Sequence, residues 1–294
     1  MQELLNTATL GSIYLLFALG MALAWGTIGI LNFAHGATFM FSVFVVYLIT
    51  GAVELSMIGV LLLAALIGAA ISLLTQLLVF QPIVRRARSH SSAELRIILG
   101  GIGVAAIPLA IAERVTNSAP FAIRSSYEAT VFSIGGVRLS STSLIVIIVG
   151  LTIGIGLTLW IRRSKQGLAL RAIGTDAETA EGMGVHRELL ALGTMAVAGA
   201  LAGLAGGLLA FQLSAMAPES GDTLLIKAFA MIVLGGLGSM GGAVIGAYVL
   251  AGAEMLMTIL GQGTWVDAVS FGLIFLILLF RPQGLFGRKE VRRA

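Results

Sequence analysis

Residues 224–259 read LLIKAFAMIVLGGLGSMGGAVIGAYVLAGAEMLMTI, an apolar stretch with only two charged side chains, Lys227 and Glu254. A bilayer core about 30 Å thick needs roughly 20 apolar residues per helix, so this stretch is too long for one spanning helix. Its middle, residues 235–242, reads GGLGSMGG and favours a break, because glycine weakens a helix. The stretch therefore predicts two shorter helices joined by a turn, or a re-entrant hairpin.

The composition of the whole chain indicates a membrane protein. Of its 294 residues, 58% are hydrophobic and 11% are charged, whereas soluble domains carry about 25% charged residues. A soluble fold could not hide this much apolar surface from water. A membrane barrel would show alternating segments of about ten residues, but the apolar runs here are longer and do not alternate. The predicted fold class is therefore all-α, as a single polytopic transmembrane domain over residues 1–294.

The chain is long enough for about eight membrane segments, one of them a broken or re-entrant pair. The predicted spans lie near 7–31, 35–51, 57–80, 95–114, 142–161, 189–211, 224–259 (broken) and 265–281.

Three basic clusters hold fourteen of the eighteen Lys and Arg residues, and they predict the orientation. Their members are Arg85, Arg86, Arg88 and Arg96; Arg162, Arg163, Lys165, Arg171 and Arg187; and Arg281, Arg288, Lys289, Arg292 and Arg293. The positive-inside rule places the segments 81–95 and 162–188 and the C-terminus in the cytoplasm.

The remaining segments follow from this orientation. Residues 115–141 and the N-terminus are expected outside, and span 224–259 must start and finish outside, with its turn near Gly238. No Lys or Arg precedes Arg85, so we expect no cleaved signal peptide. Residues 115–141 are long enough for a short surface element. Glycines within apolar segments, such as Gly199 and Gly203, are expected to allow close helix packing.

Sequence motifs for chemistry are missing. The chain has no cysteine, no phosphate-binding loop of the GxxxxGK[ST] type and no histidines at metal-ligand spacing. We therefore expect no cofactor, no metal, no nucleic-acid partner and no enzymatic activity in this chain. ATP and Mg would be bound by partner subunits.

The segment 162–188 contains the most informative polar pattern. Thr175 and Glu178 have the spacing of a capping box, which predicts a short helix beginning near Asp176. Gly182 and Gly184 are expected to end this helix. The pattern is typical both of an ordinary loop helix and of a rigid, protruding helix to which a motor protein could bind.

In several ordered blocks the chain resembles the LivH-type permeases of branched-chain amino acid ABC importers. The blocks begin with residues 29–36 (GILNFAHG), continue with 167–172 (GLALRA) and 180–185 (AEGMGV), and then 198–206, 227–229, 233–246 and 280–287. Around residues 37–43 the chain departs from the family pattern, so urea and short amides stay open as substrates.

This resemblance implies a permease in the bacterial inner membrane with several partners. They are a second, LivM-like permease, two cytoplasmic ATPases, a periplasmic solute-binding protein and membrane lipid. It also assigns the loop 165–184 to ATPase coupling, with the candidate residues Arg171, Thr175, Asp176, Glu178, Ala180, Gly182 and Gly184. We expect Ala180 and Gly182 to contact the ATPase, and Arg171 to anchor the loop to the ATPase or to lipid phosphate.

Four polar residues in the spans are candidates for the substrate path. A charge at the bilayer centre costs roughly 2.5–3.5 kcal/mol on insertion scales, so such residues usually face protein or water. Asn32 and His35 either line the path near the inner mouth or cap the helix break. Lys227 either faces an outer vestibule or, as we expect, extends to the membrane interface. Glu254 lies deeper in its span.

Two further classes of protein are weighed against the ABC permease. An ion-coupled secondary transporter should carry carboxylates near the membrane midplane, and only Glu254 fits. An intramembrane enzyme would need a catalytic pair, and none is recognisable in the sequence.

Overall fold

The computed structural model describes residues 1–29, 32–87, 90–134, 136–281 and 283–286. The longer helices are α1 (Gln2–Ile28), α3 (Met57–Thr75), α5 (His90–Thr116), α6 (Ser141–Arg163), α9 (Arg187–Leu213) and α11 (Met240–Ile259). The shorter helices are α2 (Ala34–Thr50), α4 (Gln81–Arg86), α7 (Lys165–Ile173), α8 (Ala177–Gly182), α10 (Ser220–Gly235) and α12 (Val266–Phe280). A π-helical turn η1 (Gln76–Phe80), a 3-10 turn η2 (Gly263–Trp265) and the strands β1 (Val131–Ile134) and β2 (Val137–Ser140) complete the described part.

Within these residues, seven helical segments are long and apolar enough to cross a membrane, and α2 is a shorter apolar helix. The predicted all-α, polytopic membrane fold is confirmed. The strands form one antiparallel hairpin in the segment 115–141, with Val131 opposite Ser140.

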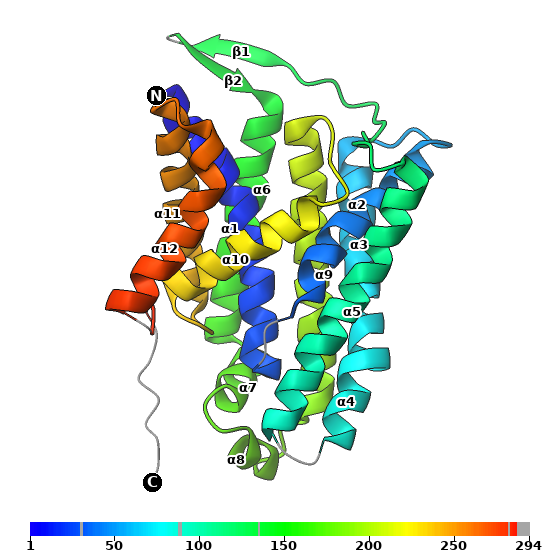
Figure 1. Ribbon diagram of the computed structural model, residues 1–294, viewed down its shortest axis with the longest axis vertical. Coiled ribbons are helices and arrows are strands. Elements are labelled where there is room, and N and C mark those ends of the chain that lie inside the picture. Colours follow the sequence, from blue (N-terminus) through cyan, green and yellow to red (C-terminus); the bar gives the residue numbers. More distant parts are fainter. Residues whose placement is uncertain (30–31, 88–89, 135, 282, 287–294) are drawn as a thin grey trace.

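Helix α1 occupies the centre of the bundle (Figure 1). Its side chains Ile13, Leu16, Phe17 and Leu19 have no exposed surface. Helices α6, α9 and α11 pack around it. The core of the protein is therefore organised around its first helix.

Small residues bring the helices close together, as the sequence predicted. A Cβ on Gly199 of α9 would overlap the carbonyl of Gly68 on α3, and one on Gly203 would overlap the carbonyl of Ala64. Apolar lipid gives apolar helices little reason to associate, so close backbone approach supplies much of the packing energy. The contact between α3 and α9 is built in this way.

The glycine-rich segment breaks the long apolar stretch, again as predicted. Helix α10 ends at Gly235, and α11 begins at Met240. The turn places Gly236 and Gly238 at φ angles of 100° and 75°, which residues with a Cβ rarely adopt. The side chain of Ser239 then caps α11 by accepting a hydrogen bond from the Gly242 amide (3.0 Å).

The first helix break falls between α1 and α2. Helix α1 continues to Ile28 and is closed by Gly29 in the left-handed conformation. Residues 30–31, which end the predicted span 7–31, lie outside the described residues, as do Arg88 and the basic residues after position 287. Helix α3 passes through η1 into α4 and so continues past the predicted span end at residue 80.

The two ends of the bundle carry different elements (Figure 1). The N-terminus and the β1–β2 hairpin lie at one end, while α4, α7 and α8 lie at the other. Segments that the orientation rule assigned to one side of the membrane thus lie together.

Candidate functional site

Lys227 of α10 lies at the centre of a polar cluster that joins four helices. Its Nζ lies 3.0 Å from Oε1 of Glu254 on α11 and 3.3 Å from Oδ1 of Asp267 on α12. The hydroxyl of Tyr14 on α1 donates to Oε2 of Glu254 (2.7 Å) and accepts from Lys227 (3.2 Å). The hydroxyl of Ser270 on α12 makes a longer contact of 3.5 Å with Oε1 of Glu254. We call these five residues the Lys227 network.

Glu254 and Lys227 are largely buried within the network, whereas Asp267 is exposed. The side chain of Glu254 is 4% exposed and that of Lys227 is 12% exposed, whereas Asp267 is 70% exposed. A buried ion pair is tolerated when further hydrogen bonds satisfy its atoms, and Tyr14 does so here for both partners. We expected Lys227 to extend to the membrane interface. In the structure its ammonium is held between the buried Glu254 and the exposed Asp267.

The network also attaches α12 to the bundle. Ser270 is the one residue of α12 that is buried, and it contacts Glu254. Polar contacts between helices therefore add to the apolar packing of Leu273 and Ile274 against the core.

Asn32 and His35 stabilise the first helix break. The side-chain oxygen of Asn32 accepts a hydrogen bond from the Ala34 amide (3.0 Å), so Asn32 acts as a local cap. The Nε2 atom of His35 lies 3.2 Å from the carbonyl oxygen of Phe17, and the two rings lie 4.5 Å apart. A Cβ at Gly20 would lie 3.0 Å from the imidazole, so this glycine makes room for the ring.

Both residues are enclosed by the protein in this conformation. His35 has no exposed surface and Asn32 is 3% exposed, so neither lines an open path in this conformation. His35 also contacts α1 at Phe17, one helical turn after Tyr14. Helix α1 thus connects the first break to the Lys227 network.

The loop 162–188 contains two helices where the sequence predicted one. Helix α7 is capped by the side chain of Ser164, which accepts from the Gly167 amide (2.9 Å). Helix α8 begins as predicted, but its cap is Asp176, which accepts from the Thr179 amide (3.0 Å). The predicted capping box is wrong, because the hydroxyl of Thr175 donates to the carbonyl of Arg171 instead (2.9 Å).

The loop presents one face of α8 to its surroundings. Ala180 is 3% exposed and faces the protein, so it is not available as an outer contact point. Glu178 and Gly182 are exposed, and Met183 is 82% exposed. Gly184 ends this segment with a φ angle of 89°.

Arg171 remains attached to its own loop. Its Nη1 donates to the carbonyl oxygen of Arg162 at 3.4 Å, a weak contact that keeps the guanidinium near the end of α6.

Sequence reasoning missed three members of the Lys227 network. Tyr14 lies in a uniformly apolar run and gives no signal of its own. Asp267 and Ser270 both fall within the predicted span 265–281 and were not singled out as site residues. A usable signal did exist: a Lys and a Glu within the same broken stretch each need a partner of opposite charge.

Comparison with known proteins identifies the family. Residues 3–278 match the family described as "Branched-chain amino acid transport system / permease component". The chain is 30% identical to the high-affinity branched-chain amino acid transport system permease protein BraD of Pseudomonas aeruginosa, over 100% of this chain and 97% of BraD. It is 31% identical to LivH of Escherichia coli K12, with the same coverage.

A more distant relative shows the same pattern. The probable branched-chain amino acid transport permease protein LivH of Methanocaldococcus jannaschii is 31% identical, over 94% of this chain and 89% of its own length. No solved structure matches the chain. The family match covers most of the chain, and the relatives are similar over nearly their whole length. The chain therefore belongs to the family of branched-chain amino acid transport system permease components.

Proposed function

We propose that this chain is the membrane-spanning permease subunit of a binding-protein-dependent ABC importer for branched-chain amino acids. The observation that carries the proposal is the similarity over the whole chain to relatives named for this transport. The bundle supplies several membrane helices with two breaks, which is the architecture in which transporters build a path. The chain itself moves solute and hydrolyses no ATP.

The partners follow from this role. A second, LivM-like permease completes the membrane unit, two cytoplasmic ATPases bind ATP and Mg, and a periplasmic protein delivers the solute. The unit lies in the bacterial inner membrane with the C-terminus in the cytoplasm, as the basic clusters indicate.

The α7–α8 loop is proposed as the contact with an ATPase. It connects α6 directly to α9, and α9 packs against α1, so a push on the loop reaches the bundle core. The exposed face of α8, with Glu178, Gly182 and Met183, is the surface offered. The caps at Ser164 and Asp176 stiffen both short helices.

The substrate path is proposed to run beside the two breaks, bordered by Asn32, His35, Lys227 and Glu254. In this conformation Lys227 and Glu254 satisfy each other. A zwitterionic amino acid offers a carboxylate and an ammonium, the same pair of charges, and could bind there only after this ion pair opens. Passage without a strong site leaves most of the selectivity to the solute-binding protein.

Glu254 also favours one alternative, an ion-coupled transporter, because it is a buried carboxylate on a broken helix pair. Its ion pair with Lys227 already neutralises the charge that a proton or sodium ion would balance. Transport of urea or short amides by the same type of importer is the other alternative.

Uptake into vesicles separates these possibilities. The complete complex is reconstituted with its solute-binding protein and tested with leucine, isoleucine, valine, urea and acetamide. Uptake of the three amino acids that requires ATP supports the proposal. Uptake driven by an ion gradient without ATPase subunits contradicts it, and ATP-driven uptake of urea or acetamide alone corrects the substrate.

A further inference from the structure

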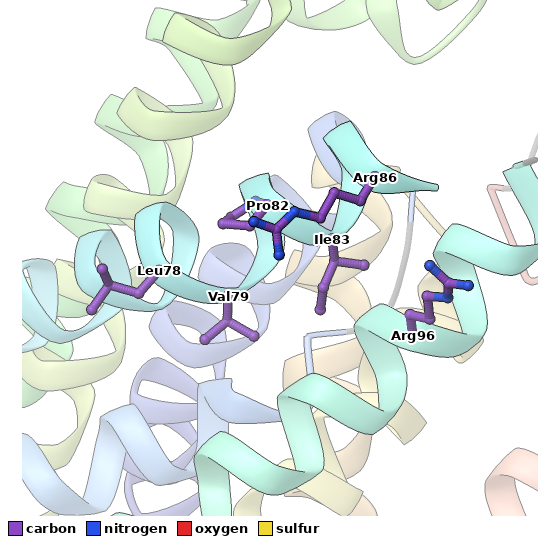
Figure 2. A pocket seen from close by; sticks show the side chains of 6 residues that line it. All are labelled: Leu78, Val79, Pro82, Ile83, Arg86 and Arg96. Atoms are coloured by element: carbon purple, nitrogen blue, oxygen red, sulfur yellow. The ribbon is translucent and has the colours of Figure 1, made fainter. Parts of the chain in front are cut away.

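A groove opens between η1, α4 and α5, near the end of the bundle that carries α7 and α8. Its volume is about 270 Å³, and it is lined by Leu78, Val79, Pro82, Ile83, Arg86 and Arg96. Figure 2 shows Leu78 at one end of the groove and Arg96 at the other, while the guanidinium of Arg86 reaches back over the middle, near Pro82 and Ile83. The groove is therefore apolar at the Leu78 end and basic from its middle to the Arg96 end.

The apolar end faces the surroundings of the bundle. Leu78 is 71% exposed, and Leu77 and Leu74 on the same continuous helix are 45% and 55% exposed. Gly100 lets α5 approach two of the lining residues closely, since a Cβ there would lie 3.0 Å from Ile83 and 3.1 Å from Val79. In a membrane, exposed leucines at this position contact acyl chains. The groove is therefore continuous with a lipid-facing surface of the bundle.

The two arginines of the groove, Arg86 and Arg96, have no polar partner among the residues that the structure describes. Arg85 makes a bidentate contact with Glu188, with distances of 2.9 and 2.7 Å. Arg86 and Arg96 are exposed, and neither makes a hydrogen bond or ion pair with any residue that the structure describes. Two free guanidiniums beside one apolar groove suit a phosphate group, which arginine binds through paired N–H donors.

We propose that this groove binds one anionic phospholipid. Its phosphate lies between Arg86 and Arg96, and an acyl chain lies along Ile83, Val79 and Leu78. The positive charge of the two arginines favours an anionic headgroup such as phosphatidylglycerol over phosphatidylcholine, because the choline group would place a further positive charge next to them. Basic pockets between membrane helices on the cytoplasmic side bind anionic headgroups for the same reason. The π-helical turn η1 forms one wall, and such turns are frequent at functional sites.

Lipid retention by the full chain tests the proposal. The protein is reconstituted in an equal mixture of phosphatidylglycerol and phosphatidylcholine, extracted in mild detergent, and analysed by native mass spectrometry. One phosphatidylglycerol per chain should be retained. The double variant R86Q/R96Q should lower this occupancy at least about tenfold, because two charge-assisted contacts are lost.

Two further variants make the result specific. R85Q/R163Q removes the same number of positive charges from the same end of the bundle and should retain the lipid. L78Q, which makes the apolar end polar and leaves the charge unchanged, should also lower retention. Inorganic phosphate added during extraction should not displace the lipid, because it cannot fill the apolar end.

Four results would overturn the proposal: equal retention of the two phospholipids, equal losses in R86Q/R96Q and R85Q/R163Q, unchanged retention in L78Q, or displacement by inorganic phosphate. A fifth would reassign the arginines to a protein partner. In that case R86Q/R96Q would lose the ATPase subunits in detergent while it kept its phospholipid.

Discussion

The ammonium of Lys227 and the carboxylate of Glu254 form an ion pair between α10 and α11, 27 positions apart in the sequence, with an N–O distance of 3.0 Å. The glycine turn between these two helices makes the pair possible, because it folds α11 back against α10. Tyr14 holds both members from α1. The pair thus joins the second helix break to the core of the bundle.

Breaking one side of this pair should be costly. Lys227→Met would leave the buried Glu254 carboxylate without a counter-charge and should destabilise the fold by roughly 3 kcal/mol or more. Thermal unfolding of the purified permease in detergent measures this. The double variant Lys227→Met/Glu254→Met should be within about 1 kcal/mol of the native protein. Equal losses in the single and double variants would show that the ion pair is not the cause.

The exposed member of the network should matter less. Asp267 is 70% exposed, so Asp267→Asn removes a solvent-screened contact worth less than about 1 kcal/mol. Hydrogen exchange in residues 266–280 should nevertheless rise, because α12 is buried only at Ser270. Glu254→Gln serves as the comparison and should destabilise the whole bundle. An unchanged exchange rate in α12 after Asp267→Asn would contradict a role of the network in attaching this helix.

The two glycines Gly199 and Gly193 of α9 offer a matched test of helix packing. Gly199→Ala places a Cβ against the backbone of Gly68 and should cost about 1–3 kcal/mol by overpacking. Gly193→Ala meets nothing within 4 Å and should be neutral or slightly stabilising. The difference in melting temperature between the two variants is the measurement. If both variants melted alike, close approach of α3 and α9 would not limit stability.

Membrane orientation is testable because the native chain has no cysteine. A cysteine at Ser126, in the segment predicted to be outside, should react with an impermeant maleimide applied to intact cells. A cysteine at Glu181, on the exposed face of α8, should react only after the membrane is opened. The reverse labelling pattern would invert the proposed orientation.

Coupling should fail when the outer face of α8 is made bulky. Gly182→Trp leaves the cap at Asp176 intact, so α8 should still form. Uptake and substrate-stimulated ATP hydrolysis should fall together, by about tenfold or more if one tight contact is lost. Leu66→Trp, at an exposed position on α3 outside this loop, is the control and should transport normally. A Gly182→Trp complex that assembled and transported at the native rate would exclude α8 as the coupling element.

Much of the fold could be predicted because membrane insertion leaves a strong signal in the sequence. The helix break at residues 235–242 was predictable, since the length of the apolar stretch and the glycines within it point to the same place. The cap of α8 was assigned to Thr175 when Asp176 makes it, because both residue types cap helices and the choice depends on the local backbone. Helix α7 and the π-turn η1 were missed, since neither changes the apolar pattern.

The candidate site was predictable only in part. Lys227 and Glu254 stood out as charges in apolar spans. Tyr14 lies more than two hundred residues before Lys227, and Asp267 lies on α12, the helix that follows α11. Only the three-dimensional packing reveals these two partners. The burial of His35 and Ala180 follows equally from packing. Sequence periodicity could not decide which face of either short segment meets a neighbour.

The central position of α1 has a consequence for how the chain is made. In the most apolar 18-residue stretch of α1, 83% is buried inside the protein. The mean hydropathy of this stretch is 1.7, against 2.7 for the segment that contains α3. The helices that cover it include α9 and α11, which emerge from the ribosome late, in the C-terminal third of the chain. During synthesis α1 must therefore remain in the bilayer without these two helices, with Ser12 and Tyr14 facing lipid. Biogenesis of this permease should be limited by the late arrival of its C-terminal third, and chains that stop before α9 should be the preferred targets of membrane proteases.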